Sequence, residues 1–194
     1  MLNFTLQVFV FSTLLLSCFQ ERSFSFLQRF QQAELVSSGA NKKAEKPTLS
    51  FSSSVKFGKQ TNQLTILVST DFSGVNSIED VQKATWKAIK GIKLASGEEL
   101  QESGLIDLSA FVKPDQPFYI AFKYTGEVSG EKPTQRTWQI SNVKLMDAPV
   151  NFQLINHPDN DEKTGWAKSS AGIAFKPAAT LKKSEGWAVS AKLQ

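Results

Sequence analysis

The chain has 194 residues, of which 41% are hydrophobic, 21% charged and 11% aromatic, and these proportions predict one ordinary globular domain. The formal net charge of +4 is spread out, with Lys42, Lys43 and Lys46 in an early segment and Lys182 and Lys183 near the end. No basic stretch is interleaved with aromatic residues, which argues against nucleic acid as a partner.

Residues 1–17, MLNFTLQVFVFSTLLLS, carry no charged side chain and are typical of a signal peptide. The run is shorter than the about 20 apolar residues that a membrane span needs. Its last residues resemble the bacterial lipobox, in which cleavage leaves an acylated cysteine as the first residue. Cys18 is the only cysteine and the chain has one histidine, so neither a disulfide nor a structural zinc site accounts for the thiol. We therefore expect Cys18 to carry a lipid that anchors the protein at the outer membrane or cell surface.

Two other interpretations of this segment stay open. One is a plain secretory signal, and the other is a buried amino-terminal helix of a cytosolic protein. The absence of Lys and Arg ahead of the apolar run departs from the usual signal-peptide pattern.

Residues 18–32 are polar with unevenly spaced phenylalanines and are expected to be a tether or a short helix, while residues 33–194 are expected to form a β-domain. In LSFSSSVKF the apolar residues Leu49, Phe51, Val55 and Phe57 alternate with polar ones, which is the pattern of a half-buried strand. LTILVST at 64–70 and FYIAFKYTG at 118–126 alternate in the same way. Short turn-rich segments separate these runs, so we predict an all-β fold with antiparallel sheets packed face to face.

The segment TWQISNVKL at 137–145 changes the parity of its apolar face. Trp138 and Ile140 share one face, whereas Val143 and Leu145 fall on the other, and a β-bulge at residues 141–142 places all four in the same core. Residues 77–90 are the only plausibly helical stretch, although a loop or a single turn fits them equally well. The predicted core contains Phe51, Ile66, Val68, Ile120, Phe122, Trp138 and Ile140.

The succession KPTLSF, LTILVSTDFSG, ATWKAI, SGLIDLSAF, FYIAFKYTG and TWQISNVKL over residues 46–145 resembles the choice-of-anchor J or cleaved-adhesin type of jelly-roll domain. This version of the domain occurs in surface lipoproteins of Sus-like glycan-uptake systems. AELVSSG at 33–39 and EGWAVSAKL at 185–193 are similar to a further strand of that family. The resemblance implies a jelly-roll β-sandwich. Ser141 stands where the family usually has aspartate, so it gives calcium only weak support, and no other cofactor is expected. The chain ends where a related protein can continue, so a truncated or abbreviated domain is a further expectation.

Residues with catalytic chemistry are few. His157 lies in the turn-rich INHPDNDEKTGW, and no G-x-S-x-G motif is present, so a Ser-His-Asp hydrolase is not expected. A glycosidase needs two suitably spaced carboxyl groups, and Glu98, Glu99 and Glu102 lie together in a polar loop where charges usually face water. We expect Asp71, Asp80 and Asp107 to cap turns rather than to bind a cation or a sugar hydroxyl.

Two tryptophans are candidates for a sugar-binding surface. Trp86 and Trp166 are each followed closely by a lysine, Lys87 and Lys168, and neither lies in a clean alternating run, so we expect both rings to be exposed. A flat aromatic face flanked by polar side chains is a common sugar-binding arrangement. Trp138 is expected to be in the core.

The sequence therefore favours a lipid-anchored, non-catalytic surface protein that binds polysaccharide or oligosaccharide for a neighbouring uptake system. One alternative is an adhesive or structural module that binds protein or matrix, which predicts a flat apolar patch. The other is a small jelly-roll glycosidase, which predicts a facing pair of carboxyl groups in a groove.

Overall fold

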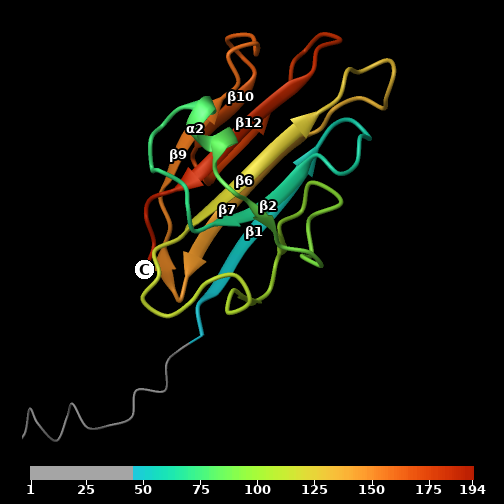
Figure 1. The fold of residues 1–194 in the computed structure, drawn as a ribbon. Helices are drawn as coiled ribbons and strands as arrows, with labels where there is room; N and C mark the ends of the chain where they lie inside the picture. The colour runs from blue at the N-terminus through green and yellow to red at the C-terminus, as the bar shows by residue number, and fades with distance from the viewer. Residues whose placement is uncertain (1–45) are drawn as a thin grey trace, which may run out of the picture. The chain divides into compact units, whose positions relative to one another are not determined.

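The computed structural model describes residues 46–194, and nearly all of their regular structure is β-strand (Figure 1). The predictions for Cys18, for the signal and tether segments and for residues 33–39 lie outside the described residues. No helix among residues 46–194 is long and apolar enough to cross a membrane. The elements are β1 (Thr48–Lys56), β2 (Leu64–Ser69), α2 (Ile78–Lys83), β3 (Lys87–Ala88), β4 (Gln101–Glu102), β5 (Ile106–Asp107), β6 (Tyr119–Gly126), β7 (Thr137–Leu145), β8 (Ala148–Pro149), β9 (Phe152–Asn156), β10 (Gly165–Ser169), β11 (Gly172–Lys176) and β12 (Ser184–Ser190).

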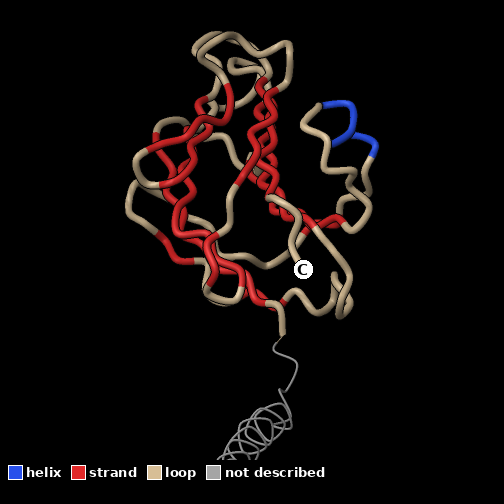
Figure 2. The backbone as a smooth tube through the Cα atoms, turned by 90° about the vertical axis from the view of Figure 1, so that its left-hand side faces the viewer, coloured by secondary structure: helices blue, strands red, loops and turns tan. Residues whose placement is uncertain are grey.

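The described strands form two sheets, and every pairing between the named strands is antiparallel. One sheet has the order β10-β11-β7-β1-β4, with β5 also paired to β1 and β8 to β7; the other has the order β3-β2-β6-β12-β9. Figure 2 shows the two sheets as separate facing layers, with α2 outside them. The predicted antiparallel β-sandwich is confirmed.

The core between the sheets contains the residues that the strand alternation predicts. All seven members of the predicted core are buried and belong to one cluster: Phe51, Ile66, Val68, Ile120, Phe122, Trp138 and Ile140. Phe122 of β6 meets Phe51 of β1 edge to face, with ring centroids 5.1 Å apart, so an aromatic pair joins the two sheets. One expectation for β1 is wrong: Phe57 is 74% exposed, because the strand ends at Lys56 and Phe57 takes a left-handed backbone conformation (φ 57°).

The predicted bulge in β7 is present. Between the pairs Ser50↔Lys144 and Ser52↔Ser141, β1 advances by two residues and β7 by three. Asn142 has a φ of 53°, a conformation that asparagine tolerates better than most residues. The extra residue brings Val143 and Leu145 back to the side of Ile140, as the parity change predicts.

A second apolar cluster lies on the outer face of the five-stranded sheet, beneath α2. Trp187 and Val189 of β12 and Leu67 of β2 point outward there, and Val81 of α2 covers them with no exposed surface. α2 is a single short helix: the Ser77 hydroxyl accepts a hydrogen bond from the backbone N–H of Asp80 (3.1 Å) at its start. Of the interpretations left open for residues 77–90, the structure has a helical segment of six residues followed by an extended one.

Candidate functional site

Trp166 is buried between the sheets and cannot stack on a ligand. It is only 3% exposed and packs edge to face against Phe175, with ring centroids 5.4 Å apart. Asn156 holds its backbone on both sides, accepting from the Trp166 N–H (2.7 Å) and donating to the Trp166 carbonyl (3.1 Å). The prediction that Trp166 is exposed is wrong, because this residue lies opposite Phe175 on the inward face of β10.

Trp86 is half-buried and belongs to the cluster on the outer face of the five-stranded sheet. Its indole N–H donates to the carbonyl of Val81 (2.8 Å), and its ring lies 5.5 Å from that of Trp187 and 5.7 Å from that of Phe72. Lys87 follows as an exposed residue of β3. Trp86 and Trp166 therefore lie in different clusters and do not form one aromatic row.

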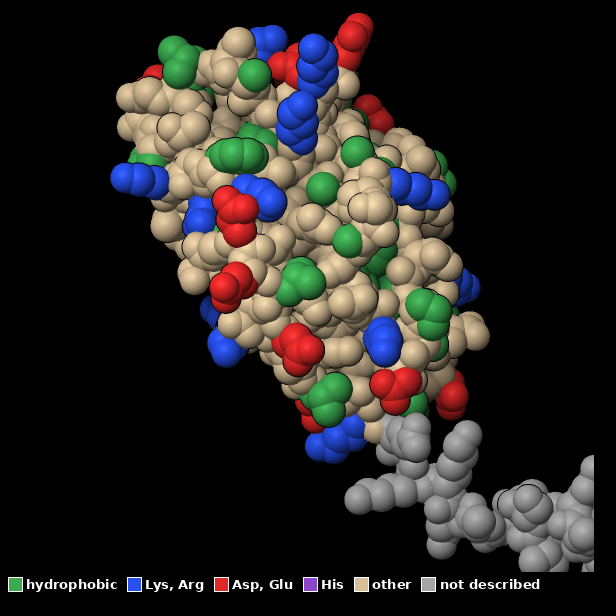
Figure 3. Space-filling model, turned by 180° about the vertical axis from the view of Figure 1, so that it is seen from behind, with side chains coloured by type: hydrophobic (Ala, Val, Ile, Leu, Met, Phe, Trp, Pro, Cys, Tyr) green, Lys and Arg blue, Asp and Glu red, His purple; other side chains and the backbone are tan. Residues whose placement is uncertain are grey.

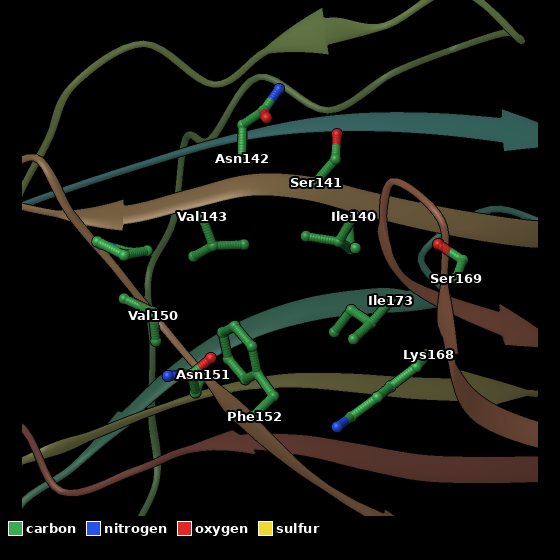
Figure 4. A pocket seen from close by; sticks show the side chains of 12 residues that line it. Ile140, Ser141, Asn142, Val143, Val150, Asn151, Phe152, Lys168, Ser169 and Ile173 are labelled. Carbon is green, nitrogen blue, oxygen red and sulfur yellow. The ribbon is translucent and has the colours of Figure 1, made fainter.

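A pocket of about 540 Å³ opens where the bulged end of β7 faces the β8–β9 segment and the β10–β11 hairpin. Figure 4 shows that Ile140 and Val143 of β7 point toward the side occupied by Val150, Phe152 and Ile173. Four of these five side chains are aliphatic and one is aromatic, so the pocket has an apolar wall built from three parts of the chain. Its volume is within the range of ordinary small-ligand sites.

Polar groups surround this apolar wall. Asn151 lies beside Phe152, and Lys168 extends from β10 with its ammonium group on the Phe152 side of Ile173 (Figure 4). Ser141 and Asn142 stand on the other side of β7 from Ile140 and Val143. The hydroxyl oxygens of Ser141 and Ser169, both lining residues, are buried and have no hydrogen-bond partner among the described residues.

Lys168 is the one charged side chain that lines this pocket. It lies two residues from Trp166 on the same inward face of β10, opposite Ile173 of β11. None of the ion pairs among the described residues includes Lys168, and no aspartate or glutamate lines the pocket. Of the four residues proposed from the sequence as sugar ligands, Lys168 lines this pocket, and Trp86, Lys87 and Trp166 do not.

The three aspartates predicted to cap turns all make local hydrogen bonds. Asp107 accepts from the backbone N–H of Ser109 two residues on (2.8 Å), and hydrogen bonds from the Ser109 side chain and backbone, together with nearby Lys46, lower its pKa to about 2. Asp80 accepts from the Ser77 hydroxyl at the start of α2 (2.7 Å). Asp71 accepts from the Ser69 hydroxyl (2.7 Å) and from the Thr85 N–H (2.9 Å), which lower its pKa and tie the end of β2 to the segment before Trp86.

The other acid and base candidates face solvent or hold turns. Glu98, Glu99 and Glu102 are exposed, and Glu98 pairs with Lys56 (3.2 Å). His157 accepts a hydrogen bond at Nδ1 from the backbone N–H of Asp159 (3.2 Å), as a turn residue does. Within residues 46–194, no three His, Cys, Asp or Glu side chains are grouped so that they could hold a metal ion.

Sequence reasoning missed most of the pocket. Phe152 and Asn151 follow a short hairpin, and the alternation of Val150, Phe152 and Leu154 could have shown a strand there. This strand meets residues 140–143 and 168–173 only in the folded sandwich. The alternation within one segment does not predict which strands become neighbours.

The chain also matches a protein-family model. The model described as "Domain of unknown function (DUF5017)" matches residues 38–157, which is more than half of the chain. No curated protein and no solved structure matches the chain. The matched segment ends within the turn after β9, so it includes the β7 and β8–β9 sides of the pocket but not the β10–β11 hairpin.

Proposed function

The chain belongs to the DUF5017 family, and from its pocket we propose that it is a non-catalytic, lipid-anchored surface protein that binds glycan. The observation that carries this proposal is the pocket lined by Phe152, Asn151 and Lys168 at the open side of the sandwich. The resemblance to surface lipoproteins of glycan-uptake systems, and the lipobox-like sequence before Cys18, support the cellular setting.

A sugar ring has the mixed chemistry that this lining offers. Its C–H face is apolar and packs against an aromatic or aliphatic wall, here Phe152 and its neighbours. Its hydroxyl groups both donate and accept hydrogen bonds. The Asn151 amide does the same, whereas the Lys168 ammonium only donates. A weak, reversible complex with one or two sugar units fits a pocket of about 540 Å³.

The chemistry of the lining supports binding rather than hydrolysis. A glycosidase of the common type uses two carboxyl groups, and none of the residues that line the pocket carries one. The exposed large hydrophobic side chains of the described region lie in separate connections between strands, among them Phe57, Val75, Leu105 and Leu181. Such scattered residues give the adhesive alternative less support than a continuous patch.

The proposal is tested by electrophoresis of the full-length chain, purified in detergent, through native gels that each contain one polysaccharide. The wild type is expected to be retarded in at least one gel, and Asn151→Ala should move faster in that gel. Gln153→Ala is the matched control, because Gln153 is an exposed amide on the same segment that does not line the pocket. Retardation in no gel of a broad panel would contradict glycan binding.

Trp86→Ala separates this site from the surface predicted from the sequence. If Trp86→Ala abolishes retardation while Asn151→Ala has no effect, the sugar binds on the outer face of the five-stranded sheet and the pocket assignment is wrong. Because Trp86 packs on Trp187 and Phe72, the melting temperature of this variant must be measured as well.

The membrane part of the proposal has its own test. Cells expressing the wild type or Cys18→Ala are labelled with a palmitate analogue. We expect label on the wild type alone, because Cys18 is the only thiol in the chain. Equal labelling of both proteins would contradict acylation at Cys18.

A further inference from the structure

We infer that the pocket selects sugars that carry an anionic group, a carboxylate or a sulfate, and that Lys168 binds this group. The inference rests on the proposed glycan-binding function and specifies the class of ligand. It begins from the position of the lysine: Lys168 continues the inward row of β10 after buried Trp166. The ammonium group thus lies on the inner side of the strand, next to an apolar wall (Figure 4).

No carboxylate among the residues that line the pocket balances the positive charge of Lys168. The lining residues are otherwise uncharged, and none of the ion pairs among residues 46–194 includes Lys168. Lys168 is an exposed residue, so its ammonium group is accessible to a ligand in the pocket. A neutral sugar would leave this charge without a partner, whereas a carboxylate or sulfate forms a charge-assisted hydrogen bond with it.

The remaining polar groups fit the rest of such a ligand. With the anionic substituent at Lys168, a pyranose ring can lie against Phe152, and its hydroxyls can face the Asn151 amide. On the face seen in Figure 3, Lys and Arg side chains are interspersed with Asp and Glu.

An inward lysine on an edge strand also has a purely structural use. β10 is the last strand of its sheet, and a charge on the inner side of an edge strand hinders pairing with a second molecule. This use predicts that removal of the charge causes association of the chain with itself and leaves glycan binding intact. The two roles are therefore separable by experiment.

The experiment compares acidic with neutral polysaccharides in the same native gels. Polygalacturonate, alginate, hyaluronan and chondroitin sulfate are the acidic probes, and mannan, dextran and methyl-esterified polygalacturonate are the neutral ones. We expect retardation of the full-length chain in at least one acidic gel and in no neutral gel. Retardation in neutral gels only would overturn the inference while leaving glycan binding in place. Retardation in none would contradict the proposed function itself.

Charge variants separate Lys168 from the overall positive charge of the chain. Lys168→Met should weaken binding in the acidic gel by about tenfold or more, the loss expected for one charge-assisted hydrogen bond, and Lys168→Arg should retain most of it. Lys176→Met is the matched control, because Lys176 is exposed on the neighbouring strand, outside the pocket, and its loss changes the net charge equally. Equal losses for Lys168→Met and Lys176→Met would overturn the inference, as would self-association of Lys168→Met with unchanged binding.

Discussion

Among single residues, Tyr124 shows how polar groups are kept inside the sandwich. Its ring is fully buried and stacks on Phe175, with centroids 3.7 Å apart. Its hydroxyl accepts from the Gln63 amide (2.6 Å) and donates to the carbonyl of Arg136 (3.1 Å). Gln63 in turn accepts from the Arg136 N–H (3.0 Å). Burial raises the pKa of Tyr124 far above its ordinary value, so the phenol remains a neutral donor.

Removing this hydroxyl takes one buried hydrogen bond from the Gln63 amide and one from the Arg136 carbonyl. Tyr124→Phe is therefore expected to lower the free energy of unfolding by about 1 to 3 kcal/mol, measured by urea denaturation. Tyr119→Phe is the matched control, because Tyr119 is half-buried and its hydroxyl makes no hydrogen bond among the described residues. A loss for Tyr124→Phe no larger than that for the control would show that the buried network contributes little.

Asp71 predicts a dependence of stability on pH. Hydrogen bonds from Ser69 and Thr85 lower its pKa in the folded protein, so folding favours the ionised carboxylate. The unfolded chain has an ordinary pKa of about 3.9. The stabilisation is therefore fully present above that value and is lost as the pH falls through the lower folded pKa. Urea denaturation should show Asp71→Asn less stable than the wild type near neutral pH, with the gap closing in acid. A gap that does not change with pH would exclude the carboxylate as its source.

At the scale of strands, the bulge of β7 determines which of its side chains face the core and which line the pocket. Asn142 takes a left-handed conformation there, which costs a β-branched residue about 1 to 2 kcal/mol more than it costs asparagine or glycine. We expect Asn142→Val to lose about this much stability and Asn142→Gly to stay near the wild type, as measured by thermal unfolding. If valine and glycine behaved alike, the left-handed backbone would not be the constraint at this position.

The strands show what the sequence could and could not predict. Long strands with one apolar face, such as β6 and β7, were predicted from alternation, and even the bulge was visible because Val143 and Leu145 break the parity set by Trp138. β10 was missed, because its inward row consists of Trp166 followed by Lys168, and a lysine on the inward side hides the alternation. β10 pairs with β11, and β11 pairs with β7, which lies far away in the sequence. Lys168 reaches the pocket through this second pairing, which no local pattern predicts.

At the scale of the whole described unit, stability depends on contacts between the two sheets. Phe122 of the five-stranded sheet meets Phe51 of the seven-stranded sheet at 5.1 Å and Phe152 of β9 at 5.5 Å. One side chain thus contacts β1 in the opposite sheet and β9, which borders the pocket, in its own sheet. A change at this point should affect both sheets together rather than one edge.

Phe122→Ala should therefore lower the free energy of unfolding by about 3 to 5 kcal/mol, because truncating a fully buried phenylalanine removes apolar contacts and leaves a cavity. Phe57→Ala makes the same substitution at a ring that is 74% exposed, so it should change stability by less than about 0.5 kcal/mol. Both variants are measured by urea denaturation, followed by far-UV circular dichroism and by tryptophan fluorescence. The two signals should change at the same urea concentration in Phe122→Ala, because the aromatic contacts join the sheets into one cooperative unit. Separate transitions, or equal losses in the two variants, would show that the sheets do not share the single core described here.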